Sequence, residues 1–154
     1  MSRRVVFDTS TLVSAALRIG SIPHQALLEA FATCDVCSSQ GTLDELERVL
    51  NGKKFDRYLD RASRSAFVAL MRRHAISFDV PEANILTVAP ACRDPEDNQF
   101  LALADVARAN FIVSSDKDLL VLNPWHRIAV LTPAEFLAQV AAKPSSSTSP
   151  EFQL

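Results

Sequence analysis

The sequence contains few cysteines and no long apolar run, and both absences narrow the class of protein. Its three cysteines are too few, and odd in number, for a disulfide-stapled scaffold. No apolar stretch approaches the roughly 20 residues that a membrane-spanning helix requires. Near the N-terminus, Asp8 interrupts the apolar stretch that follows Arg3 and Arg4 before it could form the core of a signal peptide. We therefore expect a protein of the reducing cytoplasm.

Two of the cysteines, Cys34 and Cys37, have the spacing of a redox or zinc motif. The sequence offers no second Cys or His pair that would complete a four-ligand zinc site. We interpret both as small buried hydrophobic residues. The three histidines are scattered without ligand spacing, and we expect them to be ordinary surface or core residues.

The length and composition fit a single domain. A chain of 154 residues, 48% of them hydrophobic, buries roughly two thirds of the surface that it exposes when unfolded, which suffices for a core without disulfide or metal support. We expect this domain to span residues 1–142. From residue 143 the sequence reads Lys-Pro-Ser-Ser-Ser-Thr-Ser-Pro, so residues 143–154 are predicted to be a flexible tail, part of which could be a remnant of cloning.

The net charge of -2 conceals an asymmetry along the chain. Residues 48 to 73 hold eight of the sixteen basic residues and two of the eighteen acidic ones, so this segment is +6 and the remainder is -8. A polyanion would be attracted to the first region and cations to the second.

Short apolar runs alternate with amphipathic segments along the chain. Strands are expected at 4–7, 34–38, 76–80, 111–115 and 127–131. Helices are expected at 10–17, 23–32, 42–50, 53–75 and 94–109, with a last helix opened by the capping box Thr132-Pro-Ala-Glu135. The segment 53–75 could form two pieces, capped internally by Asp60 or Ser63. This alternation predicts an α/β fold, a three-layer α/β/α sandwich with a mainly parallel central sheet.

Two acidic residues directly follow predicted strands of this sheet. Asp8 ends the first strand and Asp116 follows the fourth, so both are expected at the carboxyl edge of the sheet, where ligands bind in such folds. Each also has a purely structural explanation, because an Asp after a strand can cap the helix that comes next. Position at the same edge favours a shared site.

Helical periodicity brings two more acids into consideration. Asp97 lies on the same helix face as Phe100 and Leu101, so its carboxylate is expected to point toward the core, although an acid is also favourable near a helix N-terminus. Glu45 and Glu47 flank the apolar stripe of their helix about equally, and periodicity does not choose between them.

Several carboxylates at one place require a positive charge that offsets their mutual repulsion. Two of them about 4 Å apart repel by roughly 4 kcal/mol at an effective dielectric of 20, so three or four together would be strongly destabilising without a cation. Hard oxygen ligands favour Mg²⁺ or Mn²⁺. Ser10 and Ser114, close in sequence to Asp8 and Asp116, could support such ligands as hydrogen-bond donors, or could serve only as caps.

Four segments carry a resemblance to a known family. They are Val5-Val-Phe-Asp-Thr-Ser10, Thr42-Leu-Asp-Glu-Leu46, Arg93-Asp-Pro-Glu-Asp-Asn-Gln-Phe-Leu101 and Ile112-Val-Ser-Ser-Asp-Lys-Asp-Leu119. In order and spacing they resemble the motifs of PIN domains, and the resemblance covers about residues 3 to 140. Within that family, the sequence is most similar to the branch that holds VapC-like toxins of type II toxin-antitoxin systems. One departure is Ser114-Ser115 before Asp116, where the family often has threonine and then a small residue.

The resemblance implies a function and a set of site residues. It implies a Mg²⁺- or Mn²⁺-dependent endoribonuclease in which Asp8, Glu45, Asp97 and Asp116 coordinate one or two ions, and it selects Glu45 over Glu47. Asp94 and Asp118 would be accessory residues. It further implies an RNA substrate, an antitoxin protein as partner and a homodimer. In the expected reaction, water activated by the ion attacks the phosphodiester in line.

The basic segment supplies a candidate substrate track. Lys53, Arg57, Arg61 and Arg64 recur every three or four residues and would line one face of an unbroken helix, with Lys54 beside them. Contacts of this kind hold the phosphate backbone without reading sequence. The alternative is an ordinary solvated helix face.

Other functions remain open at this point. Asp8-Thr-Ser after a strand resembles the haloacid dehalogenase-like phosphatases only weakly, because their second acid, two residues after the nucleophile, is Ser10 here. A catalytically weak or inactive RNA- or protein-binding module would be favoured if one of the four acids were missing, and none is. A PIN nuclease of RNA processing or quality control would carry the same residues as a toxin.

Overall fold

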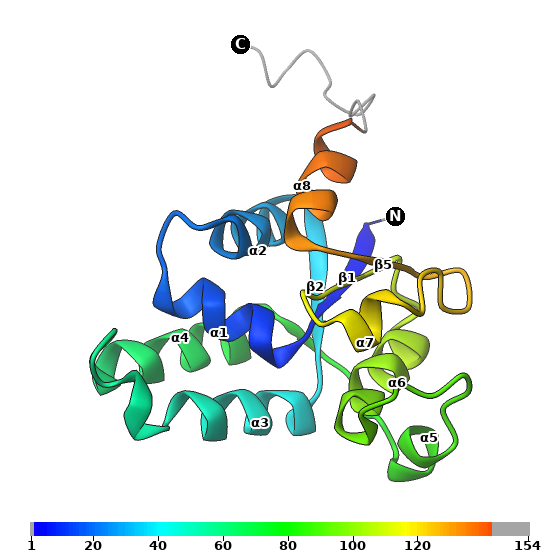
Figure 1. Cartoon of the computed structure of the whole chain (residues 1–154), viewed down its shortest axis with the longest axis horizontal. Helices are drawn as coiled ribbons and strands as arrows, with labels where there is room; N and C mark the ends of the chain where they lie inside the picture. The colour runs from blue at the N-terminus through cyan, green and yellow to red at the C-terminus, as the bar shows by residue number, and fades with distance from the viewer. Residues whose placement is uncertain (1, 143–154) are drawn as a thin grey trace.

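Five parallel strands form the centre of the molecule. The computed structural model describes residues 2–142, and its sheet has the order β3-β2-β1-β4-β5 with every neighbouring pair parallel. The strands are β1 (Arg3–Phe7), β2 (Cys34–Ser38), β3 (Ile76–Ser77), β4 (Phe111–Val113) and β5 (Ala129–Leu131). Helices flank both faces of this sheet (Figure 1), so the predicted α/β sandwich is confirmed.

Eight α-helices and two short 3-10 turns connect the strands in the described residues. The helices are α1 (Thr9–Leu17), α2 (Ile22–Thr33), α3 (Gln40–Leu50), α4 (Arg61–His74), α5 (Glu82–Leu86), α6 (Asn98–Ala107), α7 (Lys117–Leu120) and α8 (Pro133–Ala142). The 3-10 turns are η1 (Lys53–Phe55) and η2 (Pro95–Asp97). Between residues 2 and 142 no helix has the length and apolarity to cross a membrane. The predicted tail, 143–154, lies outside the described residues.

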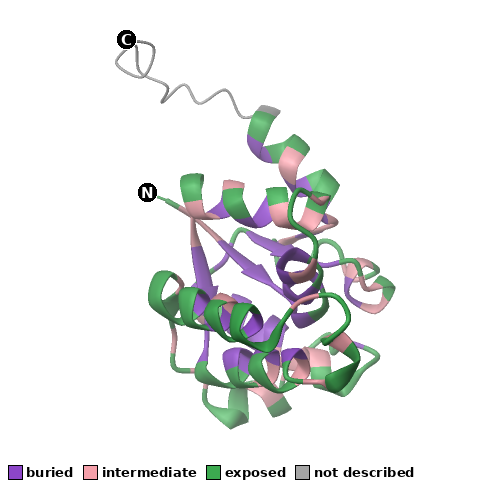
Figure 2. Cartoon of the chain, turned by 90° about the vertical axis from the view of Figure 1, so that its left-hand side faces the viewer, coloured by how far each residue is buried: buried purple, intermediate pink, exposed green. Residues whose placement is uncertain are grey.

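Alternation along the strands divides the core into two halves. Val5 and Phe7 of β1 face α1, α2, α3, α4 and α8, whereas Val6 between them faces α6 and α7. Both faces of the sheet are covered, which is why the central strands are apolar without a polar face. Figure 2 shows the buried strands enclosed by helices whose outer surfaces are exposed. Cys37 lies in the second half, as expected of a small buried hydrophobic residue, while Cys34 is half-buried.

Side-chain caps fix where the helices begin. Asp8, Ser21, Ser39 and Asp60 each accept a hydrogen bond from a backbone N–H in the first turn of the helix that follows. The predicted capping box before α8 is present, because Thr132 and Glu135 bond each other's backbone N–H groups at 3.1 and 2.9 Å. The carboxyl ends of the strands therefore pass almost directly into helices.

Some predicted boundaries differ from the structure. The segment 53–75 is not one unbroken helix but η1, a turn and α4, and the predicted alternative of two pieces is confirmed, with Asp60 as the cap that accepts from the backbone N–H of Ser63. The strand predicted at 76–80 is only two residues long, and the one predicted at 127–131 begins at Ala129. The helix predicted from residue 94 starts with η2, and α5 was not predicted.

Arg64 is the most important correction in this region. Its guanidinium is 1% exposed and donates to the backbone carbonyls of Leu50, Gly52 and Leu59, and it pairs with Asp56. The expectation that Arg64 shares an exposed basic face is wrong, because it is the buried connector that ties the end of α3 to the start of α4. The 3–4 spacing of the basic residues did not reveal this, since the helix is broken at Asp60.

Candidate active site

The carboxyl edge of the sheet brings two predicted acids together. Asp8 follows β1 and caps α1, accepting from the N–H of Thr11 at 3.1 Å, and its side chain is 3% exposed. Asp116 follows the neighbouring strand β4 and caps α7, accepting from the N–H of Asp118 at 2.9 Å. Both residues thus cap the helix that follows them, which is the purely structural role considered above. Both also lie at the carboxyl edge of the sheet.

Ser114 links these two acids. Its buried hydroxyl donates to Oδ2 of Asp8 at 2.6 Å and accepts from the backbone N–H of Asp116 at 2.9 Å. Burial raises the pKa of Asp8, and repulsion from Asp116 adds to this, while the hydrogen bonds from Ser114 and Thr11 act in the opposite direction. Asp8 is therefore held in place by hydrogen-bond donors, and within residues 2–142 it forms no ion pair with a basic side chain.

Asp97 comes to the same place from the other end of the chain. It ends η2 and directly precedes α6, and its side chain is half-buried. Partial burial raises its pKa to about 7, and contact with Asp116 and repulsion from Asp94 and Asp8 contribute. Three other carboxyl groups, those of Asp116, Asp94 and Asp8, thus lie close enough to Asp97 to contribute to this shift. The half-buried side chain of Asp97 agrees with the prediction that its carboxylate points toward the core side and not outward.

Glu45 is attached to this cluster through two neighbours of the aspartates. Its Oε2 accepts from the hydroxyl of Thr9 at 2.5 Å, and its Oε1 accepts from the amide Nε2 of Gln99 at 2.6 Å. Thr9 follows Asp8, and Gln99 lies two residues after Asp97. In contrast, Glu47 is exposed and pairs with Arg72 of α4 at 2.9 Å. The structure therefore orients Glu45, and not Glu47, toward the acidic edge.

The residues expected to be accessory lie around this edge in different roles. Asp94 is exposed and caps η2 through the N–H of Glu96 at 3.0 Å. Asp118 is half-buried in the first turn of α7. Ser10 is exposed, with its hydroxyl 3.4 Å from Oδ2 of Asp8. Of the two serines, Ser114 is thus much the more tightly engaged.

Three residues at the site, Thr9, Gln99 and Cys92, were not predicted from the sequence. Thr9 and Gln99 hold both oxygens of Glu45, and the thiol of Cys92 lies 3.9 Å from Oδ2 of Asp97. Burial raises the pKa of Cys92, so this neighbour is a neutral thiol. The position of Thr9 beside Asp8 was the one available signal; a glutamine or cysteine in these segments follows no pattern that periodicity detects.

The exposed basic residues lie at a distance from the acids. α3 leaves the carboxyl end of β2 and runs for 11 residues, about 16 Å of helix, before the chain reaches Lys53. Lys53, Lys54, Arg57 and Arg61 are exposed around this far end of α3, at the turn between α3 and α4 in Figure 1. They do not line one helix, because Asp60 separates Arg61 from the others. A contribution to substrate binding stays a prediction.

The donor chemistry of the site fits a hard divalent cation. Its groups are carboxylate oxygens, which Mg²⁺ and Mn²⁺ prefer, and within residues 2–142 none of the four acids forms an ion pair with Lys, Arg or His. Burial, and then repulsion between the acids, raises the pKa values of Asp8 and Asp97. In the described part of the chain, no three Asp, Glu, His or Cys side chains are already gathered in ligand positions. The side chains would therefore have to close around an ion.

Comparison with protein families identifies this architecture. The family model described as PIN domain matches residues 4–118, which is most of the chain and includes all four acids. The chain belongs to the PIN domain family. PIN domains are generally nucleases, which agrees with an uncompensated acidic edge in this one. No curated protein matches this PIN domain.

Solved structures with the same fold are similar to this PIN domain at low sequence identity. PAE2754 from Pyrobaculum aerophilum is 16% identical with a TM-score of 0.62, over 92% of this chain and 91% of that one. VapC20 from Mycobacterium tuberculosis, a toxin that cleaves the sarcin-ricin loop, is 15% identical with a TM-score of 0.52, over 74% and 91%. VapBC2 from Rickettsia felis, bound to a promoter DNA fragment, is 13% identical with a TM-score of 0.53, over 83% and 96%. At these identities the likeness shows the fold.

Proposed function

We propose that this PIN domain is a metal-dependent endoribonuclease that hydrolyses phosphodiester bonds of RNA. The observation that carries the proposal is the meeting of Asp8, Asp97 and Asp116 at one sheet edge without a basic partner among the described residues. Three segments distant in sequence contribute these groups, and a fold gains nothing in stability from such repulsion. A site that requires a cation to be stable explains the arrangement.

Asp8, Asp97 and Asp116, together with Glu45, would hold one or two Mg²⁺ or Mn²⁺ ions. When bound, an ion of this kind supplies Lewis-acid activation of water and of the phosphodiester. The chain's own residues set the spacing of the ligands: Ser114 joins Asp8 to the backbone of Asp116, and Thr9 and Gln99 fix both oxygens of Glu45. Donors of this type orient ligating carboxylates and strengthen metal affinity.

The test combines cleavage with metal binding. Purified protein is incubated with structured and single-stranded RNAs plus Mn²⁺ or Mg²⁺, beside an EDTA control and the Asp8→Asn variant. Asp44→Asn is a matched control, because Asp44 is an exposed acid that pairs with Arg72. We expect EDTA and Asp8→Asn to abolish cleavage and Asp44→Asn to retain it, with calorimetry showing weaker Mn²⁺ binding only in Asp8→Asn. Cleavage that persists in Asp8→Asn would refute the assigned site.

We further propose that the nuclease is the toxin of a toxin-antitoxin pair. Support comes from the fold that it shares with VapC20, a toxin, and with VapBC2. An antitoxin partner, a homodimer and a cytoplasmic location follow as expectations. Induced expression should arrest bacterial growth with the wild-type protein and not with Asp8→Asn. Cleavage in vitro without growth arrest would favour a nuclease of RNA processing or quality control.

A further inference from the structure

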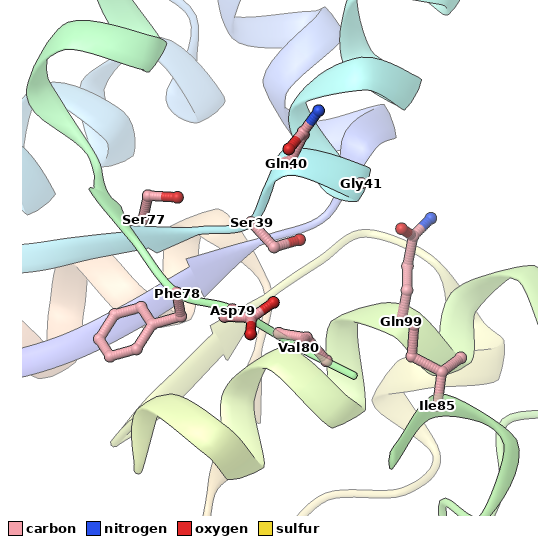
Figure 3. A pocket seen from close by; sticks show the side chains of 9 residues that line it. All are labelled: Ser39, Gln40, Gly41, Ser77, Phe78, Asp79, Val80, Ile85 and Gln99. Carbon is pink, nitrogen blue, oxygen red and sulfur yellow. The ribbon is translucent and has the colours of Figure 1, made fainter. Parts of the chain in front are cut away.

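A cavity of about 380 Å³ lies beside the acidic site, on the side toward β3. It is bounded by the start of α3, by residues 77–80 after β3, by Ile85 of α5 and by Gln99 of α6. Figure 3 shows the hydroxyl of Ser39, the carboxylate of Asp79 and the side chain of Gln99 facing a common space, with the ring of Phe78 turned away. Cavities of this volume are in the range that accommodates small ligands.

Gln99 connects this cavity directly to the acidic site. Its amide Nε2 is occupied by Glu45 at 2.6 Å, so its Oε1 is the polar atom that remains for the cavity. Gly41 lies next to this atom: a Cβ at Gly41 would be 3.6 Å from Oε1 of Gln99, in van der Waals contact with it. Along α3, Gln40 at the cavity and Glu45 at the site are five residues apart, about 7.5 Å of helix, which is the length scale of one nucleotide.

Asp79 and Gln99 bring two hydrogen-bond acceptors to the cavity, beside Gln40 and two serines whose side chains can both donate and accept. Asp79 contributes a carboxylate and Gln99 a carbonyl oxygen, and within residues 2–142 neither Asp79 nor Ser77 uses its side chain in a hydrogen bond or ion pair. A phosphate would be repelled by Asp79. Val80 and Ile85 supply an apolar wall. This combination suits a flat, uncharged group that carries amino donors on its edge.

Resting on the proposed ribonuclease function, we propose that this cavity binds the nucleobase next to the scissile phosphate and selects bases with an amino group. Adenine, cytosine and guanine each offer an amino donor to the carboxylate of Asp79, as carboxylates accept from the cytosine amino group in base recognition. Uracil offers one ring N–H between two carbonyl oxygens, which Asp79 would repel. Single-stranded RNA permits such recognition because its bases are free to turn into a pocket.

The first experiment reads the cleavage preference. A pool of single-stranded RNAs randomised around one segment is cleaved and the new ends are sequenced. We expect uracil to be disfavoured about five- to ten-fold at one fixed position beside the cut, at the lower end of the range of a good base contact because the side chain of Asp79 is exposed. Asp79→Asn, whose amide can donate to uracil, should remove or reverse this preference. A preference that is absent, or unchanged in Asp79→Asn, would overturn the proposal.

Two tryptophan variants of α5 provide a matched pair. Ile85→Trp would fill the cavity, whereas Leu86→Trp adds the same bulk at a neighbour that is 75% exposed and does not line it. Only Ile85→Trp should abolish the base preference. Loss of the preference in both variants would show that α5, and not the cavity, is responsible.

A binding measurement decides the proposal even if the protein cleaves no RNA. The Asp8→Asn variant, labelled with ¹⁵N, is titrated with the pentanucleotides A5, C5 and U5. We expect A5 and C5 to shift the backbone amide signals of Gly41, Asp79 and Val80, and U5 to shift them much less. Equal shifts with all three, or none with any, would overturn the proposal and leave the cavity to a protein partner. Such shifts, together with no RNA cleavage by the wild-type protein with Mn²⁺ or Mg²⁺, would uphold the cavity and refute the proposed nuclease.

Discussion

Charged side chains between α3 and α4 differ from those at the carboxyl edge of the sheet in whether they have partners of opposite charge. At the junction of α3 and α4, Arg64 pairs with Asp56, and Arg72 lies 3.0 Å from Asp44 and 2.9 Å from Glu47. At the carboxyl edge of the sheet, Asp8 and its acidic neighbours have hydrogen-bond donors but, among the described residues, no cationic partner. Arg64 and Arg72 thus have acidic partners within the chain, whereas the acids at the sheet edge have no basic partner among residues 2–142.

Whether a charged side chain has a partner distinguishes structural from functional charges more clearly than the number of charges does. Charges that are paired within the chain stabilise the fold, because their partners are always present. Charges that repel each other reduce stability, and their arrangement is explained when a ligand supplies the missing charge. The net charge of -8 outside residues 48–73 therefore matters less than where its carboxylates gather.

The largest effect should come from removing the buried arginine. Arg64→Ala leaves the carbonyls of Leu50, Gly52 and Leu59 without their donor, and we expect the free energy of unfolding to fall by about 3 kcal/mol. Urea unfolding followed by circular dichroism measures this. Arg61→Ala, three residues away and exposed, is the control and should change stability by no more than about 0.5 kcal/mol. Equal effects of the two would show that Arg64 is not the connector.

The acidic edge should make the metal-free protein less stable as the pH rises. Asp97 has a pKa of about 7 when folded against an ordinary 3.8, and the pKa of Asp8 is also raised. A group whose pKa is raised by folding stabilises the folded state at pH values below its pKa in the unfolded chain. This stabilisation is lost as the pH rises through its pKa in the folded protein, so the loss from Asp97 should occur between about pH 4 and pH 7.

Neutralising Asp97 should reverse that loss. At pH 8 and without metal, Asp97→Asn should raise the free energy of unfolding by about 1–2 kcal/mol, allowing for solvent screening of a half-buried group. Thermal unfolding at pH 5 and pH 8 in EDTA checks this, with Asp44→Asn as control. A variant that is less stable than wild type at pH 8 would contradict the sign.

The supports of Glu45 should matter for activity more than for folding. Gln99→Leu removes the 2.6 Å hydrogen bond to Glu45 while keeping a side chain of similar size. If the proposed site is correct, the RNA cleavage rate or the Mn²⁺ affinity should fall about tenfold. This is the usual effect of removing a hydrogen-bond donor that orients a metal-ligating carboxylate. Gln139→Leu, on an exposed residue of α8 that lies outside both the site and the cavity, is the control for RNA cleavage rate. An unchanged cleavage rate and Mn²⁺ affinity in Gln99→Leu would contradict the assignment of Glu45 to the site.

The smallest effect should come from the exposed ion pairs of Arg72. Its partners Asp44 and Glu47 are more than half exposed, so Arg72→Ala should cost about 0.5 kcal/mol, and less at high salt. Unfolding in low and high salt measures this difference. A loss as large as that of Arg64→Ala would remove the distinction between the buried and the exposed arginine.

Most of the fold and three of the four acids were predictable for a physical reason. A run such as Val5-Val-Phe7 is apolar on both faces because helices cover both sides of a parallel sheet, and the strand ends then place Asp8 and Asp116 together. Asp97 followed from helical periodicity. Glu45 did not, since its choice over Glu47 depends on Thr9 and Gln99, which reach it from other elements.

The errors arise where contacts distant in sequence decide. Arg64 has the spacing of its exposed neighbours, and only the fold shows that three backbone carbonyls surround it. The strand predicted at 76–80 contains apolar residues, yet after Ser77 the chain turns to form one wall of the cavity beside Gln99. Neither outcome is encoded in local periodicity.

The brevity of the two outer strands limits how other chains can join this sheet. β3 has two residues and β5 has three, so each edge offers a foreign strand very few backbone groups with which to pair. Short edges of this kind protect a domain from edge-to-edge aggregation. They also make it difficult for a binding protein to add a strand of its own, so a partner should engage side chains on the helical surfaces instead.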